Sequence, residues 1–272
     1  MSRVMKRHAI IKPAVLASSA LFVGATSGLT AGEPAPVMPA PVVPECGNAG
    51  WTVTAAALYL KSYAGSFGGI AGGGLDGKFD WGFRGSIGYE RPDGLFFRAV
   101  GFWYEGKTDV KDFDGDRVGS VKPKAYSGDL LIGDTFCPTA NTSLEVSAGL
   151  RYGKVEVKGR DDFFDDLKYE FDGWGPTVQL RGRRALTDRI ALYADFQQSF
   201  LFGERELRGD GDRSKSDTLA AVSELRGGIE FGWGWNRIQN AYLRLGAEGQ
   251  YWWVDSLDVG LVGGVAEVGF TF

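Results

Sequence analysis

The sequence has one histidine, two cysteines and, after its first 31 residues, no hydrophobic run long enough for a transmembrane helix. The histidine is His8, and the cysteines are Cys46 and Cys137. Imidazole is the usual side chain for proton transfer at neutral pH and a common zinc ligand. These counts exclude histidine-dependent hydrolysis and a cysteine–histidine metal cluster. We therefore predict that the protein is not an enzyme and has no metal and no cofactor.

The first 31 residues have the pattern of an export signal. Basic residues come first, and an apolar run follows from Ala14 to Ala25. This run is too short to span a bilayer as a helix, and small residues lead from it to Ala31. We predict a signal peptide over 1–31 that is cleaved near Ala31 and removes His8 with it. An uncleaved anchor is the alternative.

Acidic residues outnumber basic residues in the rest of the chain. The whole chain has 30 basic and 34 acidic residues, and four of the basic ones lie in the signal, so the remainder has a formal charge near −8. A nucleic-acid-binding protein needs a basic face, so we predict no nucleic-acid partner. Residues 32–50 are rich in proline, which favours an extended tether, and we predict a periplasmic linker there.

From Trp51 onward, segments of about ten residues alternate between apolar and polar positions. In Asp80–Glu90, for example, Trp81 and Phe83 alternate with Arg84 and Ser86. One face of such a strand suits lipid, and the other suits a polar lumen. We predict an all-β fold, a transmembrane antiparallel up-and-down β-barrel over residues 51–272. A soluble sandwich would show the same alternation.

Short turns and longer polar loops alternate along this region. The short turns lie near 92–94, 137–141 and 186–189, and the longer loops cover 64–76, 106–123, 158–168 and 204–217. This asymmetry is typical of bacterial barrels, which have short periplasmic turns and long extracellular loops. It predicts about ten strands, with eight or twelve as alternatives. The predicted strands are 51–63, 77–91, 95–105, 124–136, 142–157, 169–184, 190–203, 218–233, 241–254 and 260–272.

Aromatic residues mark the ends of these strands. The tryptophans lie within a few residues of predicted strand ends, where their rings would settle at the membrane interfaces. The last strand carries Phe270 and Phe272 on one face, a pattern that indicates an assembly signal. We predict a cell outer membrane of Gram-negative type, with outer-membrane lipids and the barrel assembly machinery as partners. Whether the barrel is a homo-oligomer stays open.

Charged residues of both signs occupy the positions that this register turns inward. The numbers of positive and negative residues are nearly equal, so the lumen has no strong electric field that would reject cations or anions. Inward glycines such as Gly153, Gly246 and Gly269 indicate residual space, although a ten-stranded barrel lies near the filled end of the size range. The predicted pore-lining residues are Lys78, Asp80, Arg84, Arg98, Asp129, Glu145, Arg151, Arg181, Asp195, Glu224, Arg226, Glu230, Arg244, Glu248 and Glu267.

The two cysteines are predicted to lie on the same side of the membrane. Cys46 precedes the first strand, and Cys137 follows the fourth, so both belong to the periplasmic end. Disulfides persist in that compartment. We predict a Cys46–Cys137 bond that pins the linker beneath the barrel mouth.

Glycine and aromatic positions recur in three stretches, Asp172–Leu186 (DGWGPTVQLRGRRAL), Leu192–Gly203 (LYADFQQSFLFG) and Ala247–Phe270. These stretches resemble the Legionella-type major outer membrane porin family, which includes planctomycete members. The resemblance implies a pore-forming outer-membrane barrel and carries no catalytic residues. We therefore expect a narrow, weakly selective pore for passive diffusion of ions and small solutes. The alternative is a sealed structural or adhesin-like barrel that acts through its surface.

Overall fold

The computed structural model describes residues 49–64, 75–111, 117–161, 167–209, 212–235, 238–255 and 257–272. The predicted signal peptide and nearly all of the predicted linker lie outside these ranges. The described elements are all strands, in agreement with the predicted all-β class. They are β1 (Gly50–Ala64), β2 (Leu75–Glu90), β3 (Leu95–Glu105), β4 (Thr108–Lys111), β5 (Arg117–Thr139), β6 (Thr142–Asp161), β7 (Leu167–Ala185), β8 (Ile190–Gly209), β9 (Asp212–Trp235), β10 (Ile238–Val254) and β11 (Leu257–Thr271).

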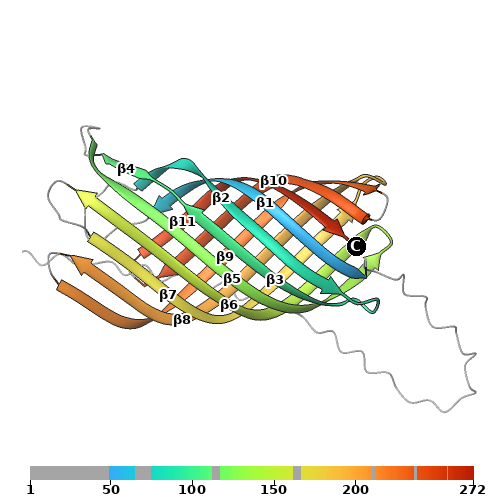
Figure 1. Cartoon of the computed structure of the whole chain (residues 1–272), viewed down its shortest axis with the longest axis horizontal. Helices are drawn as coiled ribbons and strands as arrows, with labels where there is room; N and C mark the ends of the chain where they lie inside the picture. Colours follow the sequence, from blue (N-terminus) through green and yellow to red (C-terminus); the bar gives the residue numbers. More distant parts are fainter. Residues whose placement is uncertain are drawn as a thin grey trace, which may run out of the picture. The chain divides into compact units, whose positions relative to one another are not determined.

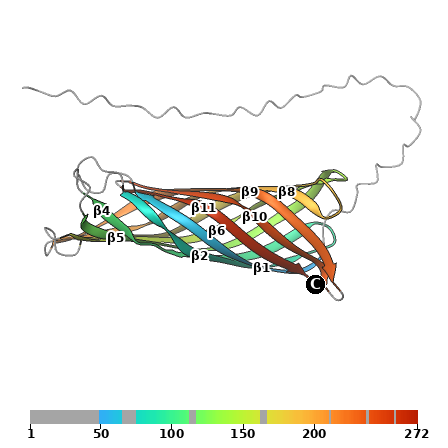
Figure 2. The same ribbon diagram turned by 90° about the horizontal axis from the view of Figure 1, so that it is seen from above.

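The strands form one closed antiparallel barrel (Figure 1). Apart from β3 and β4, each strand pairs with the next one along the chain, and β1 pairs with β11. Both β3 and β4 pair with β5, so β4 continues β3 and the wall has ten strands. Figure 2 shows the same barrel after a quarter turn. The predicted ten-stranded up-and-down topology is therefore confirmed.

The outer face of the wall is apolar. On β8, Ala191, Asp195 and Leu201 are buried, whereas Phe196 and Phe200 between them are exposed. Similar alternation on the other strands exposes a continuous band of large hydrophobic side chains, far more than a soluble protein tolerates. This band excludes the soluble sandwich and identifies the face that contacts lipid. None of the described residues belongs to a helix of the length and apolarity that a membrane crossing requires.

Aromatic side chains form a girdle at each end of this band. At the end that carries the C-terminus, Trp51 and Tyr89 are exposed, with ring centroids 5.3 Å apart. Towards the other end, Trp81 contacts Tyr59 and Trp103 stacks on Phe83, with centroids 5.0 Å and 5.9 Å apart. Such rings lie at the two interfaces of a bilayer.

The strands on one side of the barrel are longer than the sequence predicts. Most of the predicted loop 204–217 is strand, because β8 continues to Gly209 and β9 starts at Asp212. The predicted loop 158–168 is likewise shortened from both sides by β6 and β7. These extensions lie beyond the apolar band, where the outward face no longer contacts lipid. The alternation of apolar and polar residues therefore stops there, although the backbone pairing continues. Sequence pattern therefore locates the membrane boundary and not the strand end.

Candidate functional site in the barrel interior

The interior of the barrel is filled by two layers of side chains. The layer nearer to β4 is apolar, and its centre is Trp252, whose exposed fraction is 0%. Its members include Leu58, Leu60, Val155, Phe171, Leu201, Val222, Trp252, Val254 and Leu261. The sequence predicts polar side chains along the whole lumen. This prediction is wrong for the half nearer to β4, which is apolar. In β1, Leu58 and Leu60 face inward and Val53 and Tyr59 face outward, so this strand has apolar side chains on both faces.

The second layer, nearer to the C-terminal end, consists of charged and amide side chains. Cross-strand register places opposite charges next to each other, as in Asp129 opposite Arg151 and Asp195 opposite both Arg181 and Arg226. Neighbouring pairs of this kind connect the wall strands laterally. They are nearly or fully buried in the barrel interior.

Glu224 connects parts of the wall that are not neighbours. Arg151 on β6 donates to Glu224 on β9 through Nη1 at 2.6 Å, although β7 and β8 lie between the two strands. Arg84 on β2 reaches the same carboxylate at 3.4 Å and donates to Glu248 on β10 at 2.6 Å and 2.7 Å. Each of these side chains is no more than 5% exposed. The two arginines therefore extend across the lumen and meet at Glu224.

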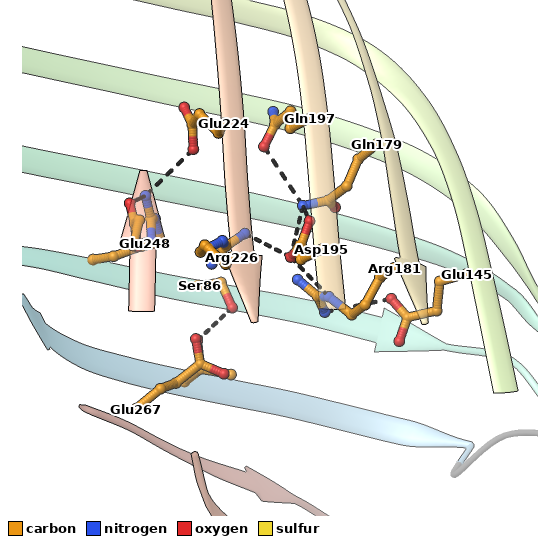
Figure 3. Close-up of polar contacts among 12 residues, drawn as sticks. Ser86, Glu145, Gln179, Arg181, Asp195, Gln197, Glu224, Arg226, Glu248 and Glu267 are labelled. Carbon is orange, nitrogen blue, oxygen red and sulfur yellow. Dashed lines mark hydrogen bonds and ion pairs between the residues drawn. The ribbon is translucent and has the colours of Figure 1, made fainter. Parts of the chain in front are cut away.

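A second cluster surrounds Asp195 (Figure 3). This carboxylate accepts hydrogen bonds from Gln179 at 3.0 Å, Arg181 at 3.1 Å and Arg226 at 2.7 Å. Arg181 also lies 3.4 Å from Glu145, which in turn pairs with Arg98 on β3 at 2.8 Å. The network therefore extends over at least five strands without a gap in its chain of contacts.

The last part of the layer is built around Arg244. Its guanidinium donates to Glu230 at 2.8 Å and to Glu267 at 3.0 Å, and it lies over the rings of Tyr193 and Tyr242. Cation–π contacts of this kind add to the ion pairs when the group is desolvated. Arginine suits these positions because its planar fork satisfies two carboxylates at once.

The structure places thirteen of the fifteen predicted pore-lining residues in this charged layer. Lys78 and Asp80 instead lie at the loop end of β2, where Asp80 accepts a hydrogen bond from the backbone of Lys107 at 2.8 Å. The prediction omitted the neutral Gln179 and Gln197, which bond to Asp195 and Asp129. Both glutamines occupy inward positions in the alternation of β7 and β8, and this is the signal from which the sequence could have predicted them.

The inward glycines do not leave free space, contrary to the sequence-based expectation. A Cβ atom on Gly153 would lie 2.6 Å from Leu201 and 3.0 Å from Trp252. Similarly, one on Gly246 would lie 2.6 Å from the Tyr193 hydroxyl, and one on Gly269 would lie 2.2 Å from the Tyr242 ring. Large side chains from other positions occupy the volume above these glycines. The interior can be packed this densely only because the glycines have no side chain.

The predicted assembly and disulfide residues lie at the C-terminal end of the barrel. Phe272 is exposed on the outer face, and its backbone N–H donates to Trp51 at 2.9 Å. Cys137 is disulfide-bonded, and Cys46, the other cysteine of the chain, lies outside the described residues. Among the described residues, no group of three or more histidine, cysteine or acidic side chains is arranged to hold a metal ion.

Comparison with known proteins identifies the fold. No family model matches the chain, and neither does any curated protein. The outer membrane protease OmpT of Escherichia coli is similar in structure, with a TM-score of 0.55, 11% identity, and 82% of this chain and 97% of that chain covered. The translocator domain of autotransporter NalP from Neisseria meningitidis follows with a TM-score of 0.41, 11% identity, and coverage of 82% and 89%. Together with the apolar outer band, the fold makes this chain an outer-membrane β-barrel.

Proposed function

We propose that the protein is a sealed outer-membrane barrel with a structural and surface-presenting role, and that it is not an open diffusion pore. The observation that carries this proposal is the contact of Arg84 and Arg151 with Glu224 across the lumen. The function then belongs to the outer wall and the loop ends, because the contacts across the lumen leave no path for a solute between the described side chains.

Physical considerations support a closed lumen. A permeating ion would have to separate buried ion pairs, and removing one partner of such a pair costs about 3 kcal/mol or more. It would then meet the apolar layer around Trp252, which offers no hydrogen bonds to replace water. The narrow pore expected from the sequence is therefore the rival proposal, supported by its charge balance and family resemblance.

We propose no catalytic role. OmpT is named a protease, but the similarity at 11% identity concerns the fold. The only histidine of this chain is His8, and the interior carboxylates of the charged layer are held by arginines.

Planar-bilayer recording of the refolded protein tests whether the lumen is sealed. We expect no conductance steps from the wild type, because both layers fill the cross-section. The matched variants are Trp252→Ala/Arg151→Ala, which opens both layers, and Trp253→Ala/Lys158→Ala. Trp252 and Arg151 are at most 2% exposed inside the barrel, whereas Trp253 and Lys158 are about half exposed on its outside. Small steps are expected only from the interior double variant.

Folding of each protein is checked first by heat-modifiable migration in gels. Reproducible steps from correctly folded wild-type protein, with weak preference between cations and anions, would establish the pore and reject the sealed barrel.

A further inference from the structure

The extended strands carry a row of five basic residues in direct cross-strand register. Each member lies directly opposite the next one on the neighbouring strand, from β5 to β9. The members are Lys122, Lys158, Lys168, Arg208 and Arg213. All five belong to the outward-facing alternation of their strands, and Lys158, Arg208 and Arg213 are about half exposed. Like charges directly opposite each other destabilise a sheet, so five in a row need an explanation. We call these five residues the basic row.

The neighbouring carboxylates do not balance the basic row. Glu156, Glu170 and Glu206 lie in the adjacent register row, and they also contact Lys154 and Lys215. Glu156 pairs with Lys158 at 2.8 Å and Lys168 at 3.3 Å, and Glu206 pairs with Arg208 and Arg213. These three carboxylates are thus shared among six cations, of which Lys215 also pairs with Glu204 at 3.1 Å.

Lys122, at one end of the basic row, has no ion-pair partner within the described part of the chain. Acidic side chains that could offset this excess, Asp172, Glu204 and Asp217, lie in a register row further from the loop end. Among the side chains that the structure describes at this end, positive charge is therefore concentrated in the basic row.

The location of the basic row points to its ligand. The outward aromatic residues Tyr152, Trp174 and Phe202 end the apolar band on β6, β7 and β8, and the charged rows begin at the next outward position. The basic row lies two further outward positions away, at the barrel end opposite the C-terminus, where Figure 1 shows the ends of β5 to β7. Loop asymmetry makes this end extracellular. The row lies six residues beyond this girdle, about 20 Å along tilted strands, which reaches the phosphorylated sugar headgroups of the outer leaflet. It spans about 19 Å at the usual strand spacing.

We propose that the basic row binds the phosphate groups of a phosphorylated glycolipid in the outer leaflet of the outer membrane. Lysine and arginine bind phosphate through charge-assisted hydrogen bonds, and clustered basic residues beside a membrane recruit anionic headgroups. Bound phosphates would offset the repulsion within the row. This inference is independent of whether the lumen is sealed.

The test measures lipid bound to the full-length mature barrel in nonionic detergent micelles containing bisphosphoryl lipid A, by native mass spectrometry. The row variant is Lys158→Ala/Lys168→Ala/Arg208→Ala. The control variant, Arg91→Ala/Arg184→Ala/Arg189→Ala, removes the same charge from exposed positions at the opposite end of the barrel. We expect the row variant to bind at least about tenfold less lipid A, and the control to bind as the wild type does.

Ligand-free stability gives a second readout. Without lipid A, the row variant should melt close to the wild-type temperature, because relief of the repulsion within the row offsets the loss of exposed ion pairs with Glu156, Glu170 and Glu206. It should lose the stabilisation that lipid A confers. If the alanine variant does not fold, Lys158→Gln/Lys168→Gln/Arg208→Gln replaces it.

Three results would overturn the proposal. The first is equal binding of lipid A by the row variant and the wild type, and the second is equal binding of the dephosphorylated glycolipid by the wild type. The third is loss of binding to a soluble sulfated polysaccharide with lipid A binding unchanged, which would assign the row to a soluble polyanion.

Discussion

Arg151 illustrates how a single residue holds the interior together. Its Nε and Nη2 atoms donate to Asp129 at 2.5 Å and 2.9 Å, and its Nη1 donates to Glu224 at 2.6 Å. A lysine could not make this arrangement, because its ammonium is a compact point charge. The cations of the charged layer are arginines, whereas the basic row outside the barrel is mostly lysine. The buried ion pairs require the fixed geometry of a guanidinium, whereas an exposed positive charge is sufficient in the basic row.

Replacing Arg151 should strongly destabilise the barrel. Arg151→Met keeps the length of the side chain but leaves Asp129 and Glu224 buried without this cation, at a cost of about 3 kcal/mol in the free energy of unfolding. Lys158→Met on the same strand removes an exposed charge and should cost less than about 1 kcal/mol. Urea unfolding in detergent micelles measures both. Equal effects of the two substitutions would mean that the interior ion pairs contribute no more than surface pairs.

At the scale of the strand, β11 closes the barrel against β1. Their register runs from Thr52 opposite Thr271 to Ala64 opposite Val259, and Phe272 adds backbone hydrogen bonds to Trp51. The outer face of this strand carries Val262, Val268 and Phe272, all exposed to lipid. The last strand thus offers an apolar, regularly alternating edge before closure, which suits recognition by the assembly machinery.

We predict that Phe272→Ala lowers the fraction of protein in the outer membrane several-fold, because it removes the aromatic group proposed to be recognised. Phe136→Ala is the control, since Phe136 is a similarly exposed aromatic near the periplasmic end of β5. Cell fractionation combined with heat-modifiable gel migration measures the effect. A similar loss for both variants would assign the effect to the aromatic girdle and not to an assembly signal.

At the scale of the whole molecule, a covalent bond ties Cys137 at the end of β5 to another part of the chain. Cys137 is disulfide-bonded, and Cys46 is the other cysteine in the sequence. A bond between them closes a loop of roughly ninety residues and would stabilise the barrel by about 4 kcal/mol through the entropy of the unfolded chain.

We therefore expect unreduced protein exported to the periplasm to react with no thiol reagent after denaturation, and reduced protein to react at two positions. Mass spectrometry of the alkylated protein counts the labelled cysteines. Labelling of both residues without reduction would show that the bond does not form. Cys46→Ser/Cys137→Ser should also lower the melting temperature in non-reducing conditions only.

The sequence by itself determined the class of the fold, because alternation is a local property of each strand. Residues such as Phe196 and Asp195 are neighbours that must face opposite sides, and repeating this pattern in ten segments predicts an all-β fold. The alternating loop lengths and the tryptophans at strand ends then favour a membrane barrel over a soluble sandwich. The same alternation assigned fifteen charged residues to the interior, and thirteen of them lie in the charged layer. The alternation did not locate the end of β8 or the start of β9, because it ends at the membrane boundary and the strands continue beyond it.

Only the tertiary structure shows what the inward side chains contact. Alternation says that Arg84, Arg151 and Glu224 face inward, but their contact depends on the diameter of the barrel and on the stagger of strands far apart in sequence. For the same reason Gly153 appeared to leave space that Trp252, 99 residues later, occupies. The basic row likewise exists only through the register of five strands. Sequence specifies which side of a strand each residue faces, and closure of the barrel specifies what it meets there.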